Sequence, residues 1–147
     1  MLSSFKEYVN KEVYIHIDDE RPPKPGSNAV WLKNYNEALN WVNSISENST
    51  IGRVNFDNDI ADDAPGHDGY DILKKLLEKV LEGMRMPKEI MIHTQNQINR
   101  KNMINYIQSF CRVREISYST ENEKYMVHNK ELDRDLLVDG IVFKFQS

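Results

Sequence analysis

The chain has 147 residues, of which 39% are hydrophobic and 29% charged, and its net charge is −4. This composition is typical of a globular protein, and residues 1–147 are expected to form a single domain with its own core. The acidic balance argues against a broad nucleic-acid surface, which depends on clustered Lys and Arg. A small phosphate ligand or the end of an RNA strand stays compatible with it.

The sequence contains no apolar run of the roughly 18–20 residues that a membrane-spanning helix needs. Its first residues lack the basic start, apolar middle and small-residue cleavage site of a signal peptide. The single cysteine, Cys111, excludes an intramolecular disulfide and fits a reducing compartment. We therefore expect a cytoplasmic protein without membrane contact, and the sequence gives no indication of its oligomeric state.

The first part of the chain predicts the order strand, loop, strand, helix. Residues 12–18 (EVYIHID) are apolar and β-branched, which predicts a buried strand that ends in acids. Residues 21–28 (RPPKPGSN) contain three prolines and a glycine, which exclude a helix or a central strand. A short strand is expected at 29–33 and a helix at 34–45, with an asparagine as N-cap.

The middle of the chain continues this alternation. Residues 51–57 (IGRVNFD) predict a central strand that ends in an aspartate. Residues 70–84 have apolar side chains on one face at helical spacing, with Gly83 as a stop signal. A further strand is expected at 89–94 and an amphipathic helix at 98–110.

The last part of the chain favours β-structure. Residues 113–119 are expected to form a strand, and residues 135–145 contain two apolar runs around Asp139–Gly140, a pair typical of a hairpin turn. The whole order predicts an α/β fold with a doubly wound, mostly parallel sheet, helices on both faces and a modified C-terminal end that forms a β-hairpin. In such sheets the ligand crevice lies beyond the carboxyl ends of the strands.

Three of the expected strands end in polar side chains. These strand ends are Asp18–Asp19–Glu20–Arg21, Asp57–Asn58–Asp59 and His93–Thr94–Gln95–Asn96. Because the carboxyl ends of parallel strands meet at one edge of a sheet, we expect the three segments to converge. This convergence is the main inference from the sequence.

The acids among these residues suit a hard cation. Mg²⁺ and Mn²⁺ prefer oxygen ligands and bind through one or two carboxylates together with phosphate oxygens. Asp18, Asp19 and Asp57 would supply such a site, and without a cation each carboxylate raises the pKa of the others. Arg21 would neutralise part of the charge or direct its planar fork at a phosphate.

The remaining residues of the three segments suit acid–base chemistry and phosphate binding. His93 or Asp59 is a candidate for the proton transfer, and Thr94 and Asn96 are uncharged donors for phosphate oxygens. Each also has a structural interpretation: an Asp often caps a helix, and a His after an apolar run is often a core residue. Residues interpreted as structural or solvated are His16, Asp62, Asp63, His67 and His128.

Three motifs occur in series: DDERPP, then FDNDI followed by GHDGYDIL, then IHTQN followed by NRKNM. In this order they resemble the cyclic-phosphate processing receiver-like family over roughly Val13 to Tyr106. The resemblance implies a receiver, flavodoxin-like scaffold with a phosphoester-processing site. The stretch is also similar to two-component receiver domains, with an acid pair at Asp18–Asp19, a phosphoacceptor-like Asp57 and Thr94 at the switch position.

The chain departs from an ordinary receiver at several positions. A receiver carries a Lys at the end of its fifth strand, and Lys124 is a late and poor match for it. Arg21, Asp59, His93 and Asn96 are not receiver features but fit the cyclic-phosphate family. The resemblance therefore implies phosphoester chemistry in place of phosphorelay signalling.

These observations lead to three hypotheses. The first is a metal-dependent phosphoesterase, a hydrolase of the phosphodiesterase class, that acts on an RNA 2′,3′-cyclic end, as in RNA processing, or on a cyclic nucleotide. In it Asp57, Asp59, His93 and Arg21 are catalytic, and Asp57 is either a cation ligand or a nucleophile. The second hypothesis is a non-catalytic protein that binds a cyclic nucleotide or a phosphorylated metabolite. The third is a divergent phosphorelay receiver.

Overall fold

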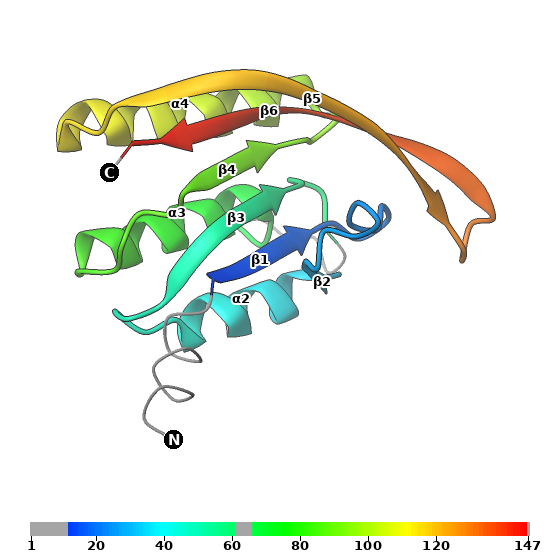
Figure 1. Ribbon diagram of the computed structural model, residues 1–147, viewed down its shortest axis with the longest axis horizontal. Coiled ribbons are helices and arrows are strands. Elements are labelled where there is room, and N and C mark those ends of the chain that lie inside the picture. The colour runs from blue at the N-terminus through cyan, green and yellow to red at the C-terminus, as the bar shows by residue number, and fades with distance from the viewer. Residues whose placement is uncertain (1–11, 61–65, 147) are drawn as a thin grey trace.

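The computed structural model describes residues 12–60 and 66–146, which form a mixed α/β fold around one six-stranded sheet (Figure 1). The elements in chain order are β1 (Glu12–Ile17), β2 (Val30–Leu32), α2 (Tyr35–Ser44), β3 (Thr50–Phe56), α3 (Gly69–Leu81), β4 (Glu89–Ile92), α4 (Gln97–Arg114), β5 (Tyr118–Asn129) and β6 (Arg134–Phe145). The strand order is β2-β1-β3-β4-β6-β5. Within these residues, no helix is both long and apolar enough to cross a membrane.

The sheet is parallel from β2 to β4 and antiparallel beyond it. β1 pairs in parallel with β2 and β3, and β3 pairs in parallel with β4. β6 then runs antiparallel to β4, and β5 pairs antiparallel with β6 along its whole length. The mostly parallel receiver-like sheet and the C-terminal hairpin are thereby confirmed.

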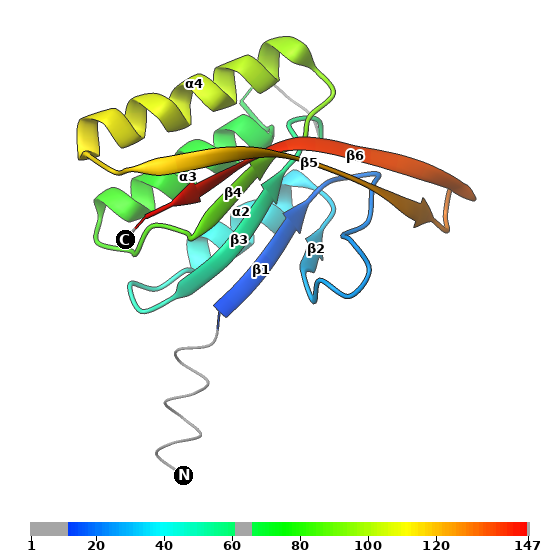
Figure 2. The same ribbon diagram turned by 45° about the horizontal axis from the view of Figure 1, so that its top comes forward.

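The three described helices pack on the same side of the sheet (Figure 2). One buried cluster joins strand residues with residues from each helix: Ile17, Phe56, Ile92, Ala38, Leu76 and Met103. This layering differs from the expected helices on both faces. In the described residues, the loop between β1 and β2 contains Pro22, Pro23 and Pro25, which prevent a helix there. The last described elements are the two strands of the hairpin, and no helix follows α4.

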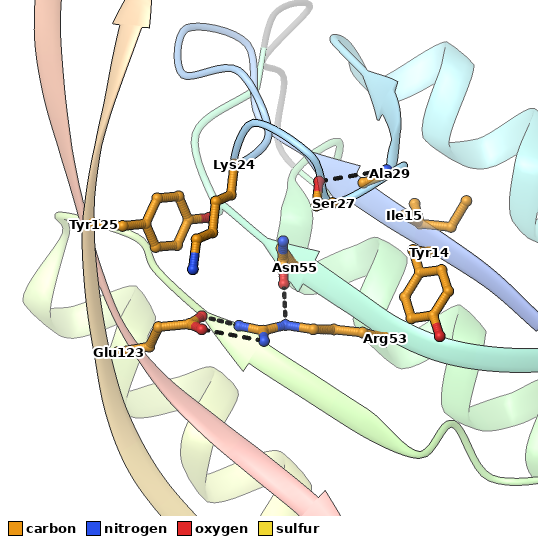
Figure 3. Close-up of a pocket in the computed structure, with 9 residues that line it drawn as sticks. All are labelled: Tyr14, Ile15, Lys24, Ser27, Ala29, Arg53, Asn55, Glu123 and Tyr125. Carbon is orange, nitrogen blue, oxygen red and sulfur yellow. Dashed lines mark hydrogen bonds and ion pairs between the residues drawn. The ribbon is translucent and has the colours of Figure 1, made fainter.

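The opposite face of the sheet has a small apolar cluster and a group of hydrogen bonds and ion pairs. The cluster consists of Met91, Val127, Val138 and Val142, beneath the hairpin. Beside it, Arg53 Nε donates to Asn55 Oδ1 at 2.8 Å, and the same guanidinium pairs with Glu123 of β5 (Figure 3). These bonds satisfy polar side chains on a face that no described helix covers.

The expected helices are confirmed with small shifts, and the strand at 113–119 is partly wrong. Asn34 is the N-cap of α2, and its side chain accepts from the N–H of Glu37. Helix α4 continues to Arg114 and ends at Glu115, which has a left-handed φ of 56°. Such a cap reverses the chain, so that β5 begins only at Tyr118.

The hairpin turn lies between Asn129 and Arg134, not at Asp139–Gly140. Asn129 Oδ1 accepts from the N–H of Leu132 at 3.0 Å, and Asp133 has a φ of 49°. Such a side-chain bond to the backbone is typical of a turn that begins with Asn. The segment predicted as a turn is instead the middle of β6.

Gly140 serves close packing in place of a turn. A Cβ at this position would lie 2.7 Å from the Ile92 carbonyl oxygen and 3.1 Å from His93 Cβ. A glycine inside a strand often marks such an approach. Because Gly140 has no side chain, β6 packs directly against the end of β4.

Gly140→Ala is expected to lower the free energy of unfolding by about 2 kcal/mol, because the new methyl group meets backbone as well as side chain. Urea denaturation measures this difference. Gly52→Ala is the matched control, since its Cβ would meet side-chain atoms of Tyr14 and Glu12 and no backbone within the three nearest atoms. A Gly140→Ala protein as stable as the Gly52→Ala protein would contradict the packing argument.

Candidate functional site

The segments that follow β1, β3 and β4 meet at the carboxyl edge of the parallel strands. One carboxylate oxygen from each of Asp18, Asp19 and Asp57 lies within 4.8 Å of the other two. Asp18 and Asp57 are buried, whereas Asp19 is exposed. The structure thus brings together the three acids expected as cation ligands, and their binding of a cation stays a prediction.

Arg21 is a buried cation at the centre of this cluster, with 6% of its surface exposed. Its Nε donates to Asp18 Oδ2 at 3.0 Å, and its Nη2 lies 3.6 Å from Asp57 Oδ2. Nη2 also donates to His93 Nδ1 at 3.2 Å and to the His93 carbonyl oxygen at 3.0 Å. The guanidinium therefore links all three strand ends in a fixed orientation.

Asp18 shapes the loop that delivers Arg21. Its Oδ1 accepts the backbone N–H groups of Glu20 and Arg21, each at 2.8 Å. Its Oδ2 accepts from Arg21 Nε, so this carboxylate keeps little capacity for a further ligand. Asp57 and Asp19 therefore have more capacity than Asp18 to bind a cation through their carboxylate oxygens.

Two buried histidines lie behind Arg21. The rings of His16 and His93 are stacked, with centroids 5.1 Å apart. His16 Nε2 donates to the Arg21 carbonyl oxygen at 2.9 Å, and its Nδ1 accepts from Asn55 Nδ2 at 3.0 Å. Since His93 Nδ1 accepts from Arg21, its proton is on Nε2, which has no partner among the described residues.

Burial keeps both imidazoles neutral. Desolvation lowers the pKa of His16 to about 4 and holds the pKa of His93 well below its ordinary value. His93 is completely buried, and its contact in the site is with Arg21. This geometry suits the positioning of Arg21, and a direct role of His93 in proton transfer stays a prediction.

The carboxyl groups are hard to ionise without a cation. Burial, followed by the charge of Asp18, raises the pKa of Asp57 to about 8 although Arg21 opposes the change. Burial also raises the pKa of Asp18 and of Asp19. A divalent cation with oxygen ligands would relieve this repulsion, so the donor set fits Mg²⁺ or Mn²⁺.

The start of α3 fixes the Asp57 segment. The Asn58 carbonyl oxygen accepts from the N–H of Gly69 at 2.9 Å, and Asn58 Oδ1 accepts from the N–H of Tyr70 at 3.0 Å. A Cβ on Gly69 would lie 1.9 Å from the Asp57 carbonyl oxygen. The Gly-Tyr-Asp motif is therefore explained by a helix that begins in direct contact with the strand end.

A hollow of about 380 Å³ opens above the cluster. Its lining consists of Asp19, Glu20, Arg21, Asp57, Asp59, Gln95, Leu136 and Leu137. Asp59 is exposed there, as a proton-transfer role would require. Thr94 is buried and accepts from the N–H of Asn96, while Asn96 caps α4, so neither belongs to the lining. Asp62 and Asp63 lie outside the described residues.

Residues 13–109 match the family model described as the cyclic-phosphate processing receiver domain. The chain belongs to this family. No curated protein matches it. Among solved structures, precorrin 8W decarboxylase of Methanobacterium thermoautotrophicum is similar at 8% identity and a TM-score of 0.37, with 99% of this chain and 89% of that chain covered.

Among the described residues that line the hollow, Arg21 is present and no lysine occurs. Lys124 is exposed on β5, where its Nζ lies 3.9 Å from Asp139 Oδ2, and it does not line the hollow. Since β6 runs antiparallel, the residue beside the end of β4 is Gly140 from the middle of that strand. The position of the receiver lysine thus has no counterpart here.

The sequence did not indicate how the supporting residues act in the site. His16, interpreted as structural, is completely buried and bonds to the Arg21 backbone directly behind the cluster, in agreement with that interpretation. The spacing of His16 and Asp18 along one strand, which places both on the same face, was a usable signal. No signal in the sequence indicated that Leu136 and Leu137 line the hollow, because their position depends on how far the hairpin curves.

Without a divalent cation, the free energy of unfolding is expected to fall by on the order of 1 kcal/mol between about pH 6.5 and about pH 8.5. The folded state holds the Asp57 proton up to a pKa of about 8, against an ordinary value of 3.8, so this stability is lost as the pH rises. The two buried histidines are neutral in the folded chain and lose their protons in the unfolded chain near pH 6.5, so they offset part of this fall at the lower end of the range and little of it at the upper end.

Urea denaturation at several pH values in the presence of a chelator measures how the free energy of unfolding changes with pH. Asp57→Asn is the control, because an amide does not titrate and the fall of the free energy of unfolding with pH should be much smaller. A native profile that is flat or rises with pH would show that Asp57 is ionised in the folded protein.

Proposed function

We propose that this chain is a metal-dependent hydrolase of cyclic phosphodiesters, with an RNA 2′,3′-cyclic end or a cyclic nucleotide as substrate. The observation that carries the proposal is the meeting of Asp18, Asp19 and Asp57 with the buried Arg21 in one hollow. Membership in the cyclic-phosphate processing family supports the substrate class. The cation would be Mg²⁺ or Mn²⁺, bound through Asp57 and Asp19, with Asp18 beside them holding Arg21.

The proposed reaction adds one water molecule to the cyclic phosphodiester and opens its ring. A bond forms between the water oxygen and phosphorus, and one ester P–O bond breaks, so that a phosphomonoester and a free hydroxyl group result. In the proposal Asp59, exposed in the hollow, accepts the proton of the attacking water, and this proton is returned through water to the leaving alkoxide. A bound cation would polarise the phosphoryl oxygen and help to ionise the water.

Arg21 is proposed to stabilise the charge on the equatorial phosphoryl oxygens. Its guanidinium is held by Asp18 at Nε and by His93 at Nη2, and its Nη1 lies 3.4 Å from the Leu137 carbonyl oxygen. A donor held in this way costs little reorganisation in the transition state. His93 is accordingly proposed as a positioning residue for Arg21.

With Mg²⁺ or Mn²⁺, the purified chain is expected to open one or more members of a panel of 2′,3′- and 3′,5′-cyclic nucleotides. Asp57→Asn should reduce turnover at least about 100-fold, because it removes a charge from the cation site. Product formation is followed by chromatography. Asp135→Asn, which removes an exposed carboxylate from the hairpin, is the matched control and should retain full activity.

The same samples separate the alternative hypotheses. Calorimetric binding of a cyclic nucleotide without turnover would favour a sequestering protein. Stable labelling of Asp57 by a small phosphodonor would favour a phosphorelay receiver. Absence of turnover on the whole panel by folded protein with either cation would contradict the proposed hydrolase.

Arg21→Lys is expected to lower kcat about 100-fold, with a smaller effect on KM. One ammonium group keeps the charge but does not reproduce the planar fork that contacts Asp18 and His93 together. Steady-state kinetics measure the effect, and circular dichroism verifies the fold. Arg112→Lys in the exposed last turn of α4 is the control. A kcat within about twofold of the native value would exclude this role of Arg21.

A further inference from the structure

A chain of hydrogen bonds runs over the face of the sheet that no described helix covers and ends at the Arg21 backbone. Arg53 Nε donates to Asn55 Oδ1 at 2.8 Å, and Asn55 Nδ2 donates to His16 Nδ1 at 3.0 Å. His16 Nε2 in turn donates to the Arg21 carbonyl oxygen at 2.9 Å. Of these four residues, the proposed reaction uses only Arg21.

The direction of every bond in this chain follows from Arg53. A guanidinium has N–H donors and no acceptor, so the atom of Asn55 that faces it is the amide oxygen. The Asn55 amide nitrogen then faces His16, whose Nδ1 has to accept. A neutral imidazole has one ring proton, which is therefore on Nε2 and is donated to Arg21. Arg53 thus determines the tautomer of a histidine that is two hydrogen bonds away.

An ion pair and burial hold the chain in this state. Arg53 pairs with Glu123 of β5 on the open face of the sheet (Figure 3). His16 is completely buried and Asn55 is 8% exposed, so water cannot readily replace a lost bond. With the other tautomer of His16, two N–H groups would face each other at Asn55 and two acceptors would face each other at Arg21.

The chain ends at a backbone position that is held from both sides. The Arg21 N–H donates to Asp18 Oδ1 at 2.8 Å, and the Arg21 carbonyl oxygen accepts from His16. The His16 ring also stacks on His93, whose Nδ1 accepts from Arg21 Nη2. A His16 with its proton on Nδ1 would release the Arg21 carbonyl group and disturb the orientation of the guanidinium at the hollow.

We infer that Asn55 and Arg53 are positioning residues for Arg21, because they keep the proton of His16 on Nε2. The inference rests on the proposed function and deepens it, since it adds residues that line no part of the hollow to those on which the rate depends. Groups that fix the tautomer of a histidine control reaction rates in several classes of active site.

The first test is the tautomer of His16 in the native chain. Nitrogen NMR of the histidine rings distinguishes a proton on Nε2 from a proton on Nδ1 and does not depend on any activity. We expect the form with the proton on Nε2. A native His16 with its proton on Nδ1 would overturn the inference.

The second test compares two substitutions of equal size. Arg53→Gln has an amide nitrogen at the position of Nε and can still donate to Asn55, whereas Arg53→Glu presents only acceptors. Each is combined with Glu123→Gln, so that Glu123 does not repel the new carboxylate, and is studied at about pH 8, where a carboxylate is ionised. In Arg53→Glu the Asn55 amide is expected to turn and the His16 proton to move to Nδ1, and in Arg53→Gln the proton should stay on Nε2.

The same two proteins test the effect on catalysis. We expect kcat for the best cyclic nucleotide to be at least about tenfold lower with Arg53→Glu than with Arg53→Gln. KM should differ much less, because Arg21 loses its orientation but keeps its charge. Circular dichroism verifies that both proteins are folded.

The outcomes separate this inference from the proposed hydrolase. An unmoved His16 proton in folded Arg53→Glu protein, or equal kcat of the two variants although the proton has moved, would overturn the inference and leave the hydrolase intact. Absence of turnover by the native chain would remove the hydrolase and the inference with it, whatever the tautomer of His16.

Discussion

The site depends on one buried guanidinium held between carboxylates and an imidazole. Arg21 contacts Asp18, lies beside Asp57 and bonds to His93, so residues from three strand ends share a single charge. Removing one partner of a buried ion pair typically costs about 3–5 kcal/mol, because the remaining charge is left uncompensated. The same contacts that bring the strand ends together therefore stabilise the fold and orient the donor that the chemistry would use.

The unusual layering of the sheet follows from the same arrangement. The proline-rich loop after β1 replaces a helix, and this lets Arg21 turn inward over the end of β4. In place of a second helical layer, the described face carries the Arg53–Asn55–His16 hydrogen bonds, which support the Arg21 backbone from behind. The hairpin then curves to the other side of the hollow. The receiver-like scaffold thus has a hollow lined by the strand ends on one side and by hairpin residues as well.

Local sequence patterns were sufficient for the helices, for the parallel strands and for the meeting of the strand ends, but not for the bounds of the last two strands. The apolar periodicity of 70–84 predicted α3, and the rule for parallel strands predicted the gathering of acids. Patterns failed where tertiary contacts decide: Gly140 resembles a turn residue until the closeness of β4 is known. The contact of Arg21 with His93, which are far apart in the chain, likewise has no local signal. The residue types in the sequence indicated the chemistry of the site. The hydrogen bonds that set the role of each residue could not be derived from the sequence.

The carboxylates beside Arg21 are proposed to bind a divalent cation. Anomalous diffraction from a crystal soaked in Mn²⁺ tests it most directly, because the signal locates the ion without reference to the protein atoms. We expect a peak within about 2.0–2.3 Å of oxygens of Asp57 and Asp19, on the hollow side of Arg21. A well-ordered site without a peak at saturating Mn²⁺, or a peak only on distant surface acids, would contradict the account.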